Sequence, residues 1–149
     1  MVKSSKRNLM LVLLVVVIVL AVASVIGVMF VLGVFNGLDH SSGTFIMQVE
    51  SRTSGGWTFS AQSAQGYSTI FRDLSQEELN KFSVDSSIAE GEMLLILSQD
   101  DNSQSINLSE GKITLSAEDL GMDMFNPGRV SMQLKFNGAK NLSVNISWR

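Results

Sequence analysis

The feature that most constrains this chain is a long uncharged stretch near its start. From Leu9 to Phe35 no charged residue occurs, and nearly every position is Leu, Val, Ile, Met, Phe or Ala. As an α-helix this stretch would be roughly 40 Å long, whereas the hydrocarbon core of a bilayer is about 30 Å thick. A helix satisfies its own backbone hydrogen bonds, as lipid demands. We therefore expect residues 9–35 to form one transmembrane helix that anchors the chain in the lipid bilayer.

The charges on either side of this stretch predict its orientation. Lys3, Lys6 and Arg7 precede it within a short basic tail, residues 1–8, and the first charge after it is the acidic Asp39. Positive residues stay on the cytoplasmic side of a membrane. The tail should therefore be cytoplasmic, and everything after the anchor should lie outside the cell membrane.

A cleaved signal peptide is the alternative interpretation of the same stretch. Ala21-Val22-Ala23 matches the small-x-small pattern of a cleavage site. The apolar run, however, continues well past Ala23 to Phe35, so cleavage there would leave an apolar stub on a secreted protein. The length of the run favours an uncleaved signal anchor.

The composition of the remaining chain excludes some partners and some means of stabilisation. All 14 acidic residues and eight of the 11 basic ones follow the apolar stretch, which gives that part a net charge of −6. Phosphate backbones repel such a domain, so nucleic acid is not an expected partner. The chain has no cysteine, so its core must stabilise it without disulfides.

The region after the anchor is predicted to be all β. Residues 36–43 form a short polar linker, and from residue 44 apolar and polar residues alternate, as they do in half-buried strands. The alternation is clearest over 57–62, 130–136 and 142–149. Asn137-Gly138 between the last two segments favours a hairpin turn. We expect residues 44–149 to form an antiparallel, jelly-roll-like β-sandwich of eight or nine strands.

Two further segments carry local signals, the first for a strand and the second for a helical turn that interrupts the strands. Met93–Leu97 is apolar without alternation, which is typical of a strand buried on both faces. Ser75 stands three residues before Glu78, the spacing of a capping box at the start of a short helix.

The order of several segments resembles a known group of domains. Gly43–Phe45, Gly91–Leu97, Pro127–Leu134 and Asn141–Trp148 follow one another as in small, uncharacterised extracytoplasmic β-sandwich domains of Gram-positive bacterial membrane-anchored or surface proteins. This chain differs in having Val130 where an aromatic residue is usual and in lacking a lipobox cysteine. The resemblance implies a fold and a location, and it supplies no catalytic residue.

A search for chemistry finds no catalytic constellation. The single histidine, His40, lies in the predicted linker, and no Cys is present to act as a nucleophile. Asp100, Asp101 and Asn102 could offer oxygen ligands to a hard cation such as Ca²⁺, but their spacing fits no EF-hand loop. The sequence therefore predicts no enzyme, no cofactor and no defined metal site.

Trp57 is the residue considered for a ligand surface. It lies on the apolar phase of its strand, which favours the core; an exposed indole would instead offer a stacking surface for a sugar. The sequence favours a non-enzymatic interaction or accessory module at the cell envelope, with an envelope or membrane protein as its partner. The alternative is a surface domain that binds cell-wall glycan or another carbohydrate, with or without Ca²⁺.

Overall fold

The structure, a computed structural model, describes residues 39–149. The basic tail, the anchor predicted at Leu9–Phe35, the cleavage site considered after Ala23 and the first residues of the linker lie outside the described residues. Within residues 39–149, no helix has both the length and the apolar character needed to span a membrane.

The described residues form an all-β fold, as the sequence predicts. Eight strands are joined by hydrogen bonds into a single antiparallel sheet, with two short helical segments beside it. The strands are β1 (His40–Ile46), β2 (Val49–Arg52), β3 (Gly56–Leu74), β4 (Ser83–Ser87), β5 (Glu90–Gln99), β6 (Asn102–Asn107), β7 (Lys112–Leu115) and β8 (Gly128–Ser147); the helices are α2 (Gln76–Asn80) and the 3-10 turn η1 (Met122–Met124). The strand β1 begins inside the stretch predicted as linker, because its first residues already pair with β3.

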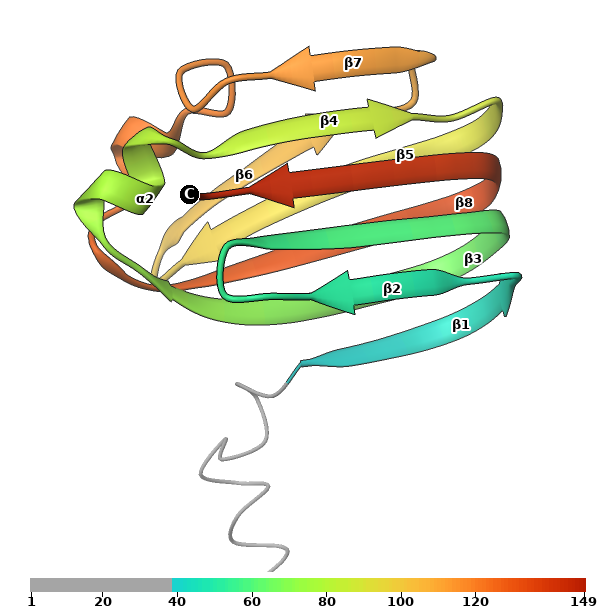
Figure 1. The fold of residues 1–149 in the computed structure, drawn as a ribbon, viewed down its shortest axis with the longest axis horizontal. Coiled ribbons are helices and arrows are strands. Elements are labelled where there is room, and N and C mark those ends of the chain that lie inside the picture. Colours follow the sequence, from blue (N-terminus) through green and yellow to red (C-terminus); the bar gives the residue numbers. More distant parts are fainter. Residues whose placement is uncertain (1–38) are drawn as a thin grey trace, which may run out of the picture. The chain divides into compact units, whose positions relative to one another are not determined.

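Two long strands, β3 and β8, organise the fold. They pair antiparallel along their whole lengths, from Gly56 opposite Ser147 to Leu74 opposite Gly128. Both strands bend in the middle, so the sheet folds over into two layers (Figure 1). In one half of the pair, β5 lies along β8 and β6 along β5, while the first residues of β1 lie along β3 on the opposite edge. The other half carries β2, β4 and β7. We call these halves the β5–β6 layer and the β4–β7 layer.

The prediction of a hairpin at Asn137-Gly138 is wrong. Residues 128–147 form one continuous strand, and the partner of both its halves is β3. Gly138 does adopt a positive φ of 60°. Near it the register shifts, because Ala64 lies opposite Ala139 while Gly66 lies opposite Phe136. The Asn-Gly pair therefore serves a β-bulge that bends the strand, and not a turn that ends it.

A pair of glycines on neighbouring strands lies at the same bend. Gly43 of β1 is opposite Gly66 of β3, with φ values of 140° and 122°. Residues with side chains rarely adopt such angles. The two glycines let the edge strand fold over together with the central pair.

One apolar core fills the space between the layers. Phe59 of the β4–β7 layer stacks on Phe136 of the β5–β6 layer with ring centroids 4.8 Å apart, and Phe45 meets both rings edge-on. Every second residue from 130 to 136 and from 142 to 148 is buried. The alternation seen in the sequence is confirmed at these positions.

The strand β5 is buried on one face only. Met93, Leu95 and Leu97 are fully buried, while Leu94 and Ile96 are half-buried on the outer face of the β5–β6 layer. No other layer formed by residues 39–149 covers that face, so within the described part of the chain the apolar run is not a strand enclosed on both sides. It leaves aliphatic side chains on an otherwise polar surface.

The capping box at Ser75 is confirmed. The Ser75 hydroxyl accepts a hydrogen bond from the Glu78 N–H, and the Glu78 carboxylate accepts one from the Ser75 N–H at 2.8 Å. Helix α2 thereby begins directly after β3 and leads the chain into β4.

Candidate ligand-binding cleft

A shallow cleft lies on the outer face of the β5–β6 layer, beside the bend. Its volume is about 370 Å³, and β3, β5 and β8 all contribute to it. Its lining residues are Gln65, Gly66, Tyr67, Glu92, Leu94, Lys135, Phe136 and Asn137. The strand register brings them together, because Tyr67 and Leu94 both lie opposite Lys135 on neighbouring strands.

The floor of this cleft is partly apolar. Tyr67 and Leu94 are both half-buried, on either side of the β8 strand. The ring of His40 meets the Tyr67 ring edge-on, with centroids 5.6 Å apart and planes at 84°. This contact steadies the tyrosine from the side of β1. The Tyr67 hydroxyl has no hydrogen-bond partner among residues 39–149, so it is available to a ligand.

Two hydrogen bonds fix the polar side chains at the rim. The Gly138 N–H donates to Gln65 Oε1 at 2.7 Å, and Asn137 Nδ2 donates to Glu92 Oε2 at 2.9 Å. Each of these three side chains keeps polar atoms to spare: Gln65 has its NH₂ group, Asn137 its amide oxygen and Glu92 its second carboxylate oxygen. The cleft therefore presents donors and acceptors that are already oriented.

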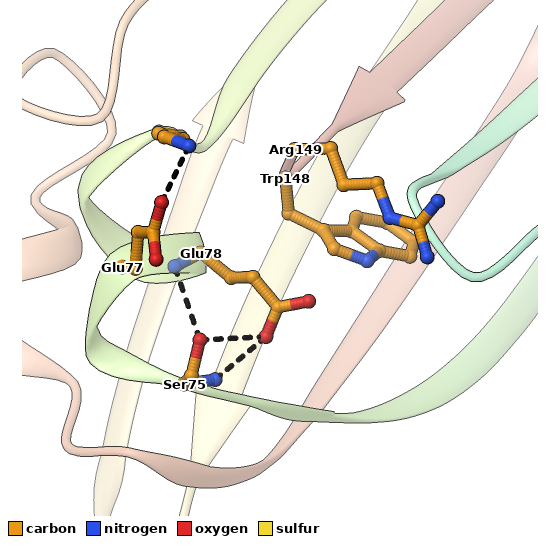
Figure 2. A pocket seen from close by; sticks show the side chains of 6 residues that line it. Ser75, Glu77, Glu78, Trp148 and Arg149 are labelled. Atoms are coloured by element: carbon orange, nitrogen blue, oxygen red, sulfur yellow. Dashed lines mark hydrogen bonds and ion pairs between the residues drawn. The ribbon is translucent and has the colours of Figure 1, made fainter.

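A second cleft lies between α2 and the end of β8. It has a volume of about 490 Å³ and is lined by Ser75, Glu77, Glu78, Lys81, Trp148 and Arg149. Figure 2 shows Glu78 bonded to Ser75 and Glu77 directed toward the end of the helix. The hydrogen bond from Lys81 and its charge lower the pKa of Glu77, and the backbone N–H and hydroxyl of Ser75 lower the pKa of Glu78. These carboxylates are occupied in stabilising α2.

Trp57, which the sequence offered as a possible ligand surface, is buried. Only 1% of it is exposed, and its indole N–H donates to Glu50 Oε1 at 2.8 Å. The same oxygen accepts from Arg52 Nε at 2.7 Å and from the Ser68 hydroxyl at 3.2 Å. A ligand-surface role for Trp57 does not agree with this burial. Its neighbours form a polar cluster that closes one side of the sandwich.

The first described residue extends this polar cluster. Asp39 accepts a hydrogen bond from the Phe71 N–H at 2.8 Å and forms ion pairs with Arg72 at 3.0 Å and Arg52 at 3.5 Å. Burial raises the pKa of Asp39, but the Phe71 N–H and the two guanidinium groups outweigh it, so the pKa lies below the ordinary 3.8. The carboxylate therefore fixes the start of the domain to β3 and β2.

Asp100, Asp101 and Asn102 lie at the tight turn between β5 and β6. Asp100 and Asp101 form the turn itself, and the side-chain NH₂ of Asn102 donates to the Met124 carbonyl at 3.0 Å. Within residues 39–149 no three His, Cys, Asp or Glu side chains are grouped so that they could hold a metal ion. The Asn102 side chain thus links this turn to η1.

The lining residues of the cleft were not identified from the sequence. The sequence held a partial signal for the cleft. Leu94 and Ile96 are apolar at positions where the outer face of a half-buried strand usually carries polar residues. That signal could not name Tyr67 or Lys135, whose positions beside Leu94 depend on pairing between distant strands.

Comparisons with known proteins assign no family. No family model and no curated protein matches the chain. Among solved structures, the carbohydrate-binding module TmCBM61, in complex with β-1,4-galactotriose, is 12% identical, with a TM-score of 0.42 over 76% of this chain and 88% of that chain. A mutant of a family 29 carbohydrate-binding module is 14% identical, with a TM-score of 0.36 over 75% of this chain and 78% of that chain.

PliG of Salmonella Typhimurium, a periplasmic lysozyme inhibitor of g-type lysozyme, is 19% identical, with a TM-score of 0.35 over 66% of this chain and 93% of that chain. Similarities of this size carry neither ligand nor activity over to the present chain.

Proposed function

We propose that this chain is a non-catalytic carbohydrate-binding domain that takes a glycan in the cleft on the outer face of the β5–β6 layer. The observation that carries the proposal is the cleft itself. Its floor is apolar at Tyr67 and Leu94, and polar side chains surround it. Two hydrogen bonds hold three of these polar side chains in place. Ligand sites in proteins typically combine an apolar lining with a few positioned polar groups.

The chemistry of the cleft suits a sugar. A pyranose ring has an apolar face of C–H groups, which can stack on an aromatic ring such as Tyr67. Its hydroxyl groups both donate and accept hydrogen bonds. Glu92 and Asn137 offer acceptors, and Gln65 and Lys135 offer donors. Because Gln65, Glu92 and Asn137 are already held, less conformational entropy is lost when a ligand binds.

The number of acids in the cleft supports binding over hydrolysis. Glu92 is the one carboxylate that lines it in the described part of the chain. Glycoside hydrolysis commonly needs two carboxyl groups on either side of the scissile bond. The cleft therefore suits a domain that holds a glycan without cleaving it.

The location belongs to the same proposal. We place the domain outside the cell membrane at the cell envelope, anchored by a transmembrane helix at residues 9–35. The uncharged stretch and the basic residues before it support this. A glycan-binding domain tethered there would lie within reach of cell-wall or surface carbohydrate.

The test is a glycan-binding measurement on the purified full chain in detergent. A glycan array identifies the oligosaccharide, and calorimetry then compares the parent chain with Tyr67→Ala. Loss of the stacking surface should weaken binding about tenfold. Thr58→Ala, on the outer face of the β4–β7 layer, is the matched control and should bind like the parent. The proposal would be refuted if the parent chain bound no glycan, or if the parent and Tyr67→Ala bound the glycan with equal affinity.

A second candidate function, an interaction module for an envelope protein, is favoured by a different surface. Ile46, Met47 and Val49 are 51%, 75% and 68% exposed at the corner between β1 and β2. Adjacent exposed apolar side chains often mark protein interfaces. Crosslinking in cells from a photoreactive group at Met47 should then capture one defined protein, and Met47→Asp should abolish its co-purification. Crosslinking to lipid alone would contradict this function.

A further inference from the structure

Two opposite charges line the cleft without pairing. Glu92 lies on β5, and Lys135 lies on β8 opposite Leu94, which is only two residues further along β5. The Glu92 carboxylate instead accepts a hydrogen bond from Asn137 Nδ2 at 2.9 Å. Lys135 makes neither an ion pair nor a hydrogen bond with any of the described residues.

Another lysine on the same two strands behaves differently. Lys140 of β8 forms an ion pair with Glu90 of β5, just beyond the bend. On α2, Lys81 likewise pairs with Glu77 at 2.7 Å. Two of the four lysines in residues 39–149 thus form ion pairs with nearby carboxylates on the surface of the domain. Lys135 is separated from its nearby carboxylate, and both groups face the same cleft.

We propose, on the basis of the glycan-binding function above, that the ligand sugar carries a carboxylate and that Lys135 binds it. The sugar ring lies against Tyr67, the ammonium group of Lys135 donates to the ligand carboxylate, and the free oxygen of Glu92 accepts from a hydroxyl. Charge-assisted hydrogen bonds are shorter and stronger than neutral ones, so Lys135 distinguishes an acidic sugar from its neutral counterpart.

The net charge of the domain limits how many carboxylates the ligand carries. The part of the chain after the apolar stretch has a net charge of −6, and its field repels a polyanion. One cation in the cleft matches one carboxylate. The ligand is therefore a largely neutral glycan with isolated acidic sugars. A uronic acid residue and a sugar with a lactyl ether, such as muramic acid, share this chemistry.

The experiment measures binding of the full chain in detergent to matched pairs of oligosaccharides. Each pair has the same length and linkage, and one member contains a single acidic sugar: a uronic acid in one series, muramic acid in the other. The acidic member should bind about tenfold more tightly. Lys135→Met should remove this preference, so that the acidic and the neutral member of each pair bind with equal affinity. Lys112→Met, on the edge strand β7, is the control and should keep the preference.

The outcomes separate this inference from the function on which it rests. Equal binding of the acidic and neutral members, or a preference that survives in Lys135→Met, would overturn the inference and leave a binder of neutral glycans. Binding of no member of any pair would overturn both. Circular dichroism of each variant shows whether its fold is retained. A preference that is seen in just one of the two series identifies which acidic sugar supplies the carboxylate.

Discussion

Gly43 and Gly66 face each other across β1 and β3, and neither has room for a side chain. A methyl group on Gly43 would lie 2.0 Å from the Gln65 carbonyl oxygen, and one on Gly66 would lie 2.1 Å from the Ser42 carbonyl oxygen. Contacts this short are with backbone, which cannot rotate away. The place where the sheet folds over therefore requires glycine on both strands.

The first prediction concerns this glycine pair. Gly66→Ala should lower the free energy of unfolding by about 3 kcal/mol, because a steric clash is added to an unfavourable φ. Gly111→Ala is the matched control: its φ is also positive at 64°, but no atom lies within 4 Å of the added methyl group. It should cost about 1 kcal/mol. Urea denaturation measures both values, and equal losses would show that the clash is relieved at no cost.

The second prediction concerns Glu50, the half-buried acceptor of the polar cluster. Glu50→Ala should lower the free energy of unfolding by about 2 kcal/mol or more, because the Trp57 indole and the Arg52 guanidinium lose their common partner. Glu110→Ala, at an exposed position, should change it by less than about 0.5 kcal/mol. The fluorescence emission of tryptophan should also shift in Glu50→Ala. Unchanged stability would mean that water replaces the carboxylate.

The third prediction concerns stability in acid. The pKa of Asp39 is lower in the folded chain than its ordinary value of 3.8, so the ionised form stabilises the fold. This contribution is complete above the unfolded-state pKa and is lost as the pH falls through the lower, folded-state pKa. Denaturation between pH 6 and pH 2 should show a steeper loss in the parent than in Asp39→Asn. Parallel curves for the two proteins would contradict the role of the ion pairs.

The fourth prediction concerns location. The chain contains no cysteine, so a single introduced thiol reports on one position. A membrane-impermeant maleimide added to intact cells should label Asn145→Cys, which lies exposed on the outer face of the β4–β7 layer. It should not label Ser5→Cys in the basic tail until the membrane is opened. Labelling of both, or of Ser5→Cys alone, would rule out the proposed orientation.

Local features of the fold were predictable from the sequence. The capping box at Ser75 and Glu78 depends on residues three apart and was predicted correctly. The alternation over residues 142–148 also depends on neighbours alone, since successive side chains of a strand point to opposite faces. Both features require no knowledge of which strands become partners.

Pairing between distant segments was not predictable in the same way. Asn137-Gly138 signals positive φ, but a turn and a bulge need the same conformation. Deciding between them requires knowing that the partner of β8 is β3, which lies more than 50 residues earlier in the chain. The cleft poses the same problem, because Tyr67, Leu94 and Lys135 meet only through the register of three strands. Sequence periodicity assigns each residue to a face of its strand, but it does not tell which residues of other strands lie beside it.

Gly66 belongs to two structures at once. It is a residue of the bend, and it also lines the cleft between Gln65 and Tyr67. Substitutions that stiffen or loosen the bend will therefore alter the spacing of the groups that meet a ligand. A substitution at Gly66, whether natural or engineered, therefore changes the stability of the fold and the ligand selectivity of the cleft together.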